Sequence, residues 1–142
     1  MDVLLALHAC DTATDDALVL AVRHDVRFFA VAPCCQAELA RSWADLPAGA
    51  LGPIHHNPHM RRTVAASVTD AMRAELLRER GFDVRCVELV EAVHTPKNTL
   101  LFGHRRSDSG SGGYSALRDA TGGCGIALAD RLGSGATRGC MP

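Results

Sequence analysis

Three short polar clusters hold the side chains best suited to chemistry. They are "HACD" at residues 8–11, "PCCQ" at residues 33–36 and "HTPKN" at residues 94–98. Thiols and imidazoles act as nucleophiles, proton carriers and ligands of soft metals. Each cluster directly follows an apolar stretch. In open α/β sheets ligands bind beyond the carboxyl ends of the strands, so we expect the three clusters to converge at one edge of a sheet.

The first two clusters allow more than one chemistry. Zinc is bound by four nitrogen or sulfur donors, and these clusters contain such a set: His8, Cys10, Cys34 and Cys35. Their spacing matches no established zinc motif, however. The other chemically active possibility is a cysteine nucleophile with a histidine as its base. Cysteines at strand ends more often serve as small packing residues, so we expect rim thiols without a metal.

The third cluster supports two interpretations equally. Lys97 is a suitable partner for a phosphate or carboxylate, and His94 and Asn98 supply polar groups at a rigid proline turn. An ordinary polar loop would have the same composition.

Other polar groups favour structural roles. Asp11, Thr12 and Asp15 fit the first turn of a helix better than a catalytic role. In "HHNPH" (residues 55–59), the proline prevents a helical pair of histidines four residues apart, which favours a solvated loop. Five arginines between residues 61 and 80 are interspersed with acidic residues and indicate a solvated helix face.

The surrounding pattern predicts the elements that carry the clusters. Apolar runs predict strands at residues 2–7, 28–33, 82–91 and 99–105, the last two as an antiparallel pair. Thr12 or Thr14 is the expected cap of a first helix, and a short helix is expected at residues 36–45. Asn57 and Pro58 begin a long helix whose apolar residues recur every four positions from Met60 to Leu76. "GPIHHNP" (residues 52–58) is expected to be a loop. We expect short helices at residues 115–120 and 126–132, and helices on both faces of the sheet.

Composition limits the class of protein. The chain has 142 residues, a formal net charge of −1 and 47% hydrophobic residues, which is typical of a globular domain without a basic nucleic-acid surface. No apolar run is long enough to span a bilayer, and the N-terminus lacks the basic region of a signal peptide. Six cysteines without a CxxC motif favour reduced thiols. We therefore expect a cytoplasmic protein without a membrane partner.

Four segments together carry a family resemblance. "LHACDTATDDAL", "VAPCCQAEL", "ELLRERGF" and "ELVEAVHTPKN" resemble the C-terminal half of a class I S-adenosylmethionine-dependent methyltransferase. The closest type has "HxC" after its fourth strand and "CC" after its fifth. It includes the methyltransferase domain of glutathione-S-transferase-C-terminal-domain-containing proteins and, more distantly, the tRNA 2′-O-methyltransferases with a CC motif. The resemblance covers about residues 2–132.

The resemblance implies an α/β fold and a site. It implies a partial Rossmann-like methyltransferase sheet of strands four to seven, with the last strand antiparallel and inserted beside the fifth, and with flanking helices. It places Leu7, His8 and Ala9 near the cofactor. Catalytic positions near the donor and acceptor are His8, Cys10, Asp11, Cys34 and Cys35, and substrate-side positions are Gln36, His94, Lys97 and Asn98. Residues 1–106 would form the half-domain, 107–113 a flexible linker, and 114–142 terminal helices with a disordered tail.

The sequence also departs from the family. The Gly-rich loop after the family's first strand and the acidic residue after its second have no counterpart here, because "SGSGGY" and "GGCG" follow the last strand. We therefore expect an S-adenosylmethionine-dependent methyltransferase that is incomplete in this chain, which alone binds the cofactor weakly or not at all. The alternative is a non-catalytic α/β binding or assembly module that pairs with another chain. The methyl acceptor is open, with RNA one candidate, and an exposed sheet edge would allow a homo-oligomer.

Overall fold

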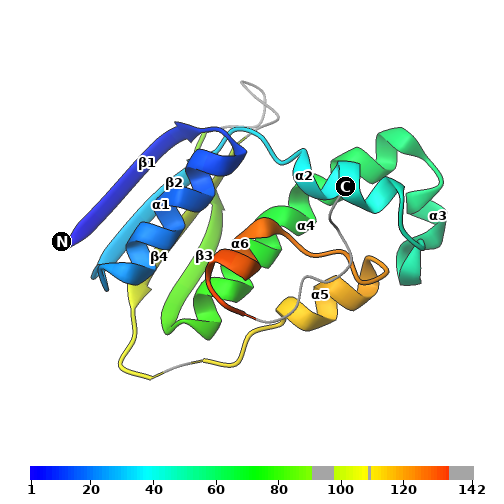
Figure 1. The fold of residues 1–142 in the computed structure, drawn as a ribbon. Helices are drawn as coiled ribbons and strands as arrows, with labels where there is room; N and C mark the ends of the chain where they lie inside the picture. The colour runs from blue at the N-terminus through cyan, green and yellow to red at the C-terminus, as the bar shows by residue number, and fades with distance from the viewer. Residues whose placement is uncertain (91–97, 109, 135–142) are drawn as a thin grey trace.

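The computed structural model describes residues 1–90, 98–108 and 110–134 (Figure 1). Strands and helices alternate in its first half, and short helices close its second half. In chain order the elements are β1 (Val3–Ala9), α1 (Asp11–Arg23), β2 (Phe28–Pro33), α2 (Glu38–Ala44), the 3₁₀ turn η1 (Gly49–Leu51), α3 (Gly52–His55), α4 (Pro58–Glu79), β3 (Phe82–Glu88), β4 (Thr99–Arg105), α5 (Tyr114–Ala120) and α6 (Ala127–Arg131).

The four strands form one open sheet in the order β1-β2-β4-β3. β1 and β2 are parallel and joined through α1, which confirms the predicted βαβ unit. β4 is antiparallel to both of its neighbours, β2 and β3. The last strand is thus inserted beside the second, as expected from the resemblance. Figure 1 shows β1 at the outer edge of the sheet, and β2 is its only partner among the described strands.

One face of the sheet carries the hydrophobic core. Residues paired across neighbouring strands point to the same side, so Leu4, Phe29 and Val84 share this face. α1 packs against β1 and β2, while α4 packs against β3 and β4. Side chains from these helices and from α6 join the strand residues in one buried cluster. The helices therefore complete a two-layer arrangement.

The opposite face is open and apolar over β1 and β2, while His104, Asp83 and Arg85 make it partly polar over β4 and β3. Leu5 is 70% exposed and Leu7 60% exposed. The other exposed apolar side chains of this face are Val3, Phe28, Val87 and Phe102. The prediction that helices cover both faces is therefore wrong for the described part of the chain. α1, α4 and α6 all join the core on the same side.

The first helix begins differently from the expectation. Cys10, not Thr12 or Thr14, stands at the N-cap position of α1, and its side chain makes no capping hydrogen bond. The Thr14 hydroxyl instead donates 2.8 Å back to the carbonyl oxygen of Ala9. Thr14 thereby fixes the turn between β1 and α1. Its acceptor, Ala9, directly precedes Cys10, the first thiol of the site.

The long helix α4 begins and ends where the sequence predicts. Asn57 is its N-cap residue, Pro58 is its first residue, and Gly81 follows its end with φ of +83°. Its buried stripe was only partly predicted, because Met60 is 50% exposed while Met72 and Leu76 are fully buried. A strict four-residue repeat advances by about 40° per step around a helix with 3.6 residues per turn, so the early members rotate away from the core.

Two further segments were predicted less well or only in outline. Residues 52–58, expected as a loop, contain the short helix α3, and the His55 ring lies 2.8 Å from the backbone oxygen of Trp43. α5 and α6 form close to their predicted positions, and the Glu38 carboxylate accepts a 2.6 Å hydrogen bond from the backbone N–H of Ala127. No helix in the described residues has the length and apolar character needed to cross a membrane.

Candidate functional site

The first two predicted clusters meet at the carboxyl ends of β1 and β2. The Sγ atoms of Cys10 and Cys34 are 3.5 Å apart, and those of Cys34 and Cys35 are 3.8 Å apart. All three sulfurs lie within 4.8 Å of one another. Cys10 is exposed and the other two are partly buried. The structure thus joins thiols from two strand ends into one cluster, which we call the thiol triad.

Parallel pairing of β1 and β2 explains this convergence. Ala9 is registered opposite Pro33, so the residues that follow each strand leave the sheet side by side. The backbone N–H of Cys34 donates 3.2 Å to the carbonyl oxygen of Ala9, which also accepts the Thr14 hydroxyl. The backbone around the triad is therefore held by bonds that do not involve the thiols.

His8 lies two residues before Cys10, at an irregularity near the end of β1. The backbone φ of His8 is +57°, a value that residues other than glycine rarely adopt. The pairing of β1 with β2 shifts register between Leu7 and Ala9. His8 and Leu7 are exposed. Asp11 begins α1, and its side chain lies outside the described part of the structure. Backbone strain at a strand end is frequent at functional sites.

The thiol neighbours alter the acidity of Cys34. Its hydrogen bond with Cys10, aided by partial burial and by Cys35, raises the pKa of the Cys34 thiol to about 11. The thiol is therefore protonated at neutral pH, which disfavours Cys34 as a nucleophile activated by a neighbouring base.

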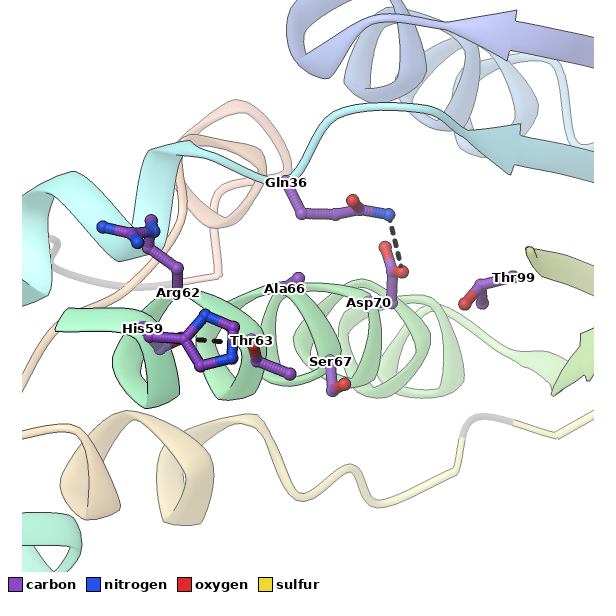
Figure 2. Close-up of a pocket in the computed structure, with 8 residues that line it drawn as sticks. All are labelled: Gln36, His59, Arg62, Thr63, Ala66, Ser67, Asp70 and Thr99. Atoms are coloured by element: carbon purple, nitrogen blue, oxygen red, sulfur yellow. Dashed lines mark hydrogen bonds between the residues drawn. The ribbon is translucent and has the colours of Figure 1, made fainter. Parts of the chain in front are cut away.

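A cleft lies between the β2–α2 connection and α4. Its volume is about 350 Å³. Figure 2 shows its lining, which consists of Gln36, His59, Arg62, Thr63, Ala66, Ser67, Asp70 and Thr99. A second hollow of about 290 Å³ shares Gln36 and Arg62 with the cleft and extends to Cys35. Cys35 of the triad thus lines a hollow that shares residues with the cleft.

Gln36 connects this surface to the core. Its side-chain amide donates 2.9 Å to Asp70 on α4 (Figure 2). Asp70 also pairs with Arg73, 3.2 Å away, and Arg73 pairs with Asp15 of α1 at 2.9 Å. Asp15, Asp70 and Arg73 are buried. The predicted substrate-side residue Gln36 therefore lies in the cleft at the end of a buried polar network.

The third predicted cluster is described only at its last residue. Asn98 is buried, and its Oδ1 accepts a 2.7 Å hydrogen bond from the backbone N–H of Val90. Its side-chain amide also donates to the Val90 carbonyl oxygen. These bonds close the β3–β4 connection. His94 and Lys97, predicted on the substrate side, lie outside the described residues.

Sequence reasoning missed the contribution of α4 to the cleft. His59 and Arg62 are exposed, in agreement with the expected solvated positions, but His59 lies in α4 and not in a loop, and both residues line the cleft. Arg73, expected on a solvated face, is fully buried. A signal was present: Arg73 directly follows Met72 and lies three residues before Leu76, so it falls within the apolar stretch of the helix. Ionisable residues at that position need partners from another element.

Comparison with known families supports the general class. Residues 1–42 match a family model described as a methyltransferase domain. This segment comprises β1, α1, β2 and most of α2, and it contains the thiol triad. Comparison with curated proteins and with solved structures gives no match. The family match and the mixed α/β sheet thus support a function of the methyltransferase type.

Proposed function

We propose that the protein is an S-adenosylmethionine-dependent methyltransferase and that the carboxyl edge of β1 and β2 faces the methyl donor and acceptor. The family match over residues 1–42 carries this proposal, because it spans both strand ends. The strand order β1-β2-β4-β3 supports it, since strands four to seven of such a sheet follow the same order. Alignment of donor and acceptor would supply most of the rate gain.

The proposed roles follow the position of each group along this edge. We assign the cofactor side to Leu7, His8 and Ala9. We assign the positions towards the reacting groups to Cys10, Asp11, Cys34 and Cys35. The raised pKa of the Cys34 thiol makes Cys34 a poor proton acceptor, so we assign that role to His8. Gln36 and the cleft along α4 form the acceptor side. His94, Lys97 and Asn98 remain proposed for the same side.

We further infer that the cofactor-binding half is supplied from outside these residues. Two features support this inference: the open apolar face, and the outer edge of β1, which has no partner strand among the described residues. Contiguous exposed apolar surface usually marks an interaction site. A second layer of helices, with strands added beside β1, would cover both features. That layer would also bring the Gly-rich loop that the sequence lacks.

The alternative function is a non-catalytic module that uses the same face to assemble. The six exposed apolar side chains of the open face favour it as much as they favour a missing helical layer. A second copy of the chain could pair along β1 and bury this surface. In that case the chain would form a stable dimer whose dissociation depends on concentration.

Reading the genomic DNA upstream of Met1 separates the two functions. The methyltransferase proposal expects an in-frame segment with a Gly-rich loop after an apolar strand. A stop codon directly upstream would contradict that proposal and favour the assembly module. Sedimentation equilibrium of the chain measures whether it forms a dimer, and so tests the assembly module independently.

The extended chain then allows a test of His8. His8→Ala is expected to weaken binding of S-adenosylhomocysteine about tenfold or more, in the range of one lost hydrogen bond of roughly 1.5–3 kcal/mol. His24→Ala is the matched control, because His24 is exposed at the opposite end of α1. Equal affinities in the two variants would contradict the assignment of His8 to the cofactor side.

A further inference from the structure

The thiol triad has the geometry of a metal site. Thiolates bound to one zinc-sized ion at about 2.3 Å lie roughly 3.8–4.0 Å apart. The structure places Cys10 and Cys34 at 3.5 Å and Cys34 and Cys35 at 3.8 Å, with all three sulfurs within 4.8 Å of one another. Small side-chain rotations would therefore bring the three sulfurs to equal distances from one ion.

The backbone fixes this arrangement without help from an ion. Hydrogen bonds from Cys34 N–H and from Thr14 to the Ala9 carbonyl oxygen hold the two strand ends together. Cys10 occupies the N-cap position of the 13-residue helix α1, where the partial positive charge of the helix end favours an anionic ligand. The exposure of Cys10 leaves a path from solvent. The donors are thus preorganised and accessible.

The donor set selects the class of ion. Thiolates are soft ligands, which favour zinc and monovalent copper over magnesium or calcium. No fourth histidine, cysteine or carboxylate joins the triad among the side chains that the structure describes. Three protein ligands with one open position are typical of reactive zinc sites, whereas structural zinc sites are closed by four.

We propose that Cys10, Cys34 and Cys35 bind one thiophilic divalent cation of the zinc class and leave its fourth position open to an external ligand. On binding, each sulfur forms a bond to the metal and its proton passes to solvent. No oxidant or reductant takes part. This inference goes beyond methyl transfer, because the site can form in the described residues without a cofactor.

Cobalt(II) is the probe that tests the site, because thiolate coordination gives it a charge-transfer band and tetrahedral geometry gives it visible ligand-field bands. The chain is reduced, freed of metal and titrated without oxygen. We expect one equivalent to bind with both sets of bands, and zinc to displace it. Absence of the charge-transfer band from folded, reduced protein would overturn the proposal.

Matched variants locate the ligands. Cys34→Ser and Cys10→Ser are each expected to weaken cobalt binding by at least about 10–100-fold, the size of effect that even outer-shell changes produce. Cys86→Ser is the control, because Cys86 lies on β3 outside the triad. Circular dichroism verifies that each variant is folded. Unchanged affinity in both triad variants would overturn the proposal.

Oxidation provides a second outcome. The 3.5 Å separation of Cys10 and Cys34 also suits a disulfide. If the chain carries the Cys10–Cys34 disulfide and binds no cobalt even after reduction, Cys10 and Cys34 form a redox pair and the metal proposal is wrong. Cobalt binding is measured without S-adenosylmethionine. A chain that binds no cobalt would therefore not contradict the proposed methyl transfer.

Discussion

The guanidinium of Arg73 lies 2.9 Å from the Asp15 carboxylate and joins the middle of α4 to the first turns of α1. Both side chains are buried. The same guanidinium pairs with Asp70, which accepts the Gln36 amide in the cleft. The position of the cleft lining therefore depends on a charge buried in the core.

Removing this charge should destabilise the fold strongly. Arg73→Met leaves Asp15 and Asp70 buried without their cation and is expected to lower the free energy of unfolding by about 3–5 kcal/mol. Urea denaturation measures the change. Arg62→Met is the control on the same helix, and its exposed position predicts a change within about 0.5 kcal/mol. Similar losses in both variants would contradict the role of the buried pair.

Gly103 should tolerate no side chain. A Cβ atom at this position would lie 2.4 Å from a ring carbon of Phe29 and 3.2 Å from the Asp83 carbonyl oxygen. Gly103→Ala is therefore expected to cost about 1–3 kcal/mol through overpacking. Gly52→Ala is the control, because its nearest neighbour would be 3.7 Å away. Thermal unfolding compares the two, and an unchanged melting temperature in Gly103→Ala would be the contrary result.

The two faces of β1 should respond differently to truncation. Leu4→Ala removes a core side chain and is expected to cost about 2–5 kcal/mol. Leu5→Ala removes an exposed side chain from the open face and should cost less than about 1 kcal/mol. Chemical denaturation at low protein concentration makes the comparison. Equal costs would show that the open face is covered in solution.

Asn98 should act on the β3–β4 connection. Asn98→Ala deprives the backbone N–H and carbonyl of Val90 of their partners, at an expected cost of about 1–3 kcal/mol. Hydrogen exchange at the Val90 amide should accelerate beyond the change in global stability. Ser67→Ala in the cleft is the exposed control. Unaltered exchange at Val90 would contradict this structural role.

The sequence was most informative where a local pattern has one structural meaning. The apolar runs at residues 2–7 and 28–33 flank a helical segment, and the structure contains β1, α1 and β2 there. Polar residues directly after parallel strands converge by geometry, so the meeting of Cys10 with the later cysteines followed from strand pairing alone. The position of β4 between β2 and β3 needed the family resemblance, because strand order is a non-local property.

The parts that were missed depend on contacts distant in sequence. Arg73 and Asp15 are 58 positions apart, and no local pattern reveals that one neutralises the other. Asp70 and His59 line the cleft because α4 runs beside the segment that connects β2 to α2, which the helical repeat does not encode. The open face was missed because the number of helices does not determine the side on which they pack.

If the edge of β1 and β2 is one part of a methyltransferase site whose main cofactor contacts lie outside the described residues, calorimetric titration of S-adenosylhomocysteine should show it. We expect no saturable heat from the folded 142-residue chain. We expect saturable 1:1 binding once the chain is extended by an upstream Gly-rich half. Micromolar binding by the 142-residue chain alone would contradict this division of the site.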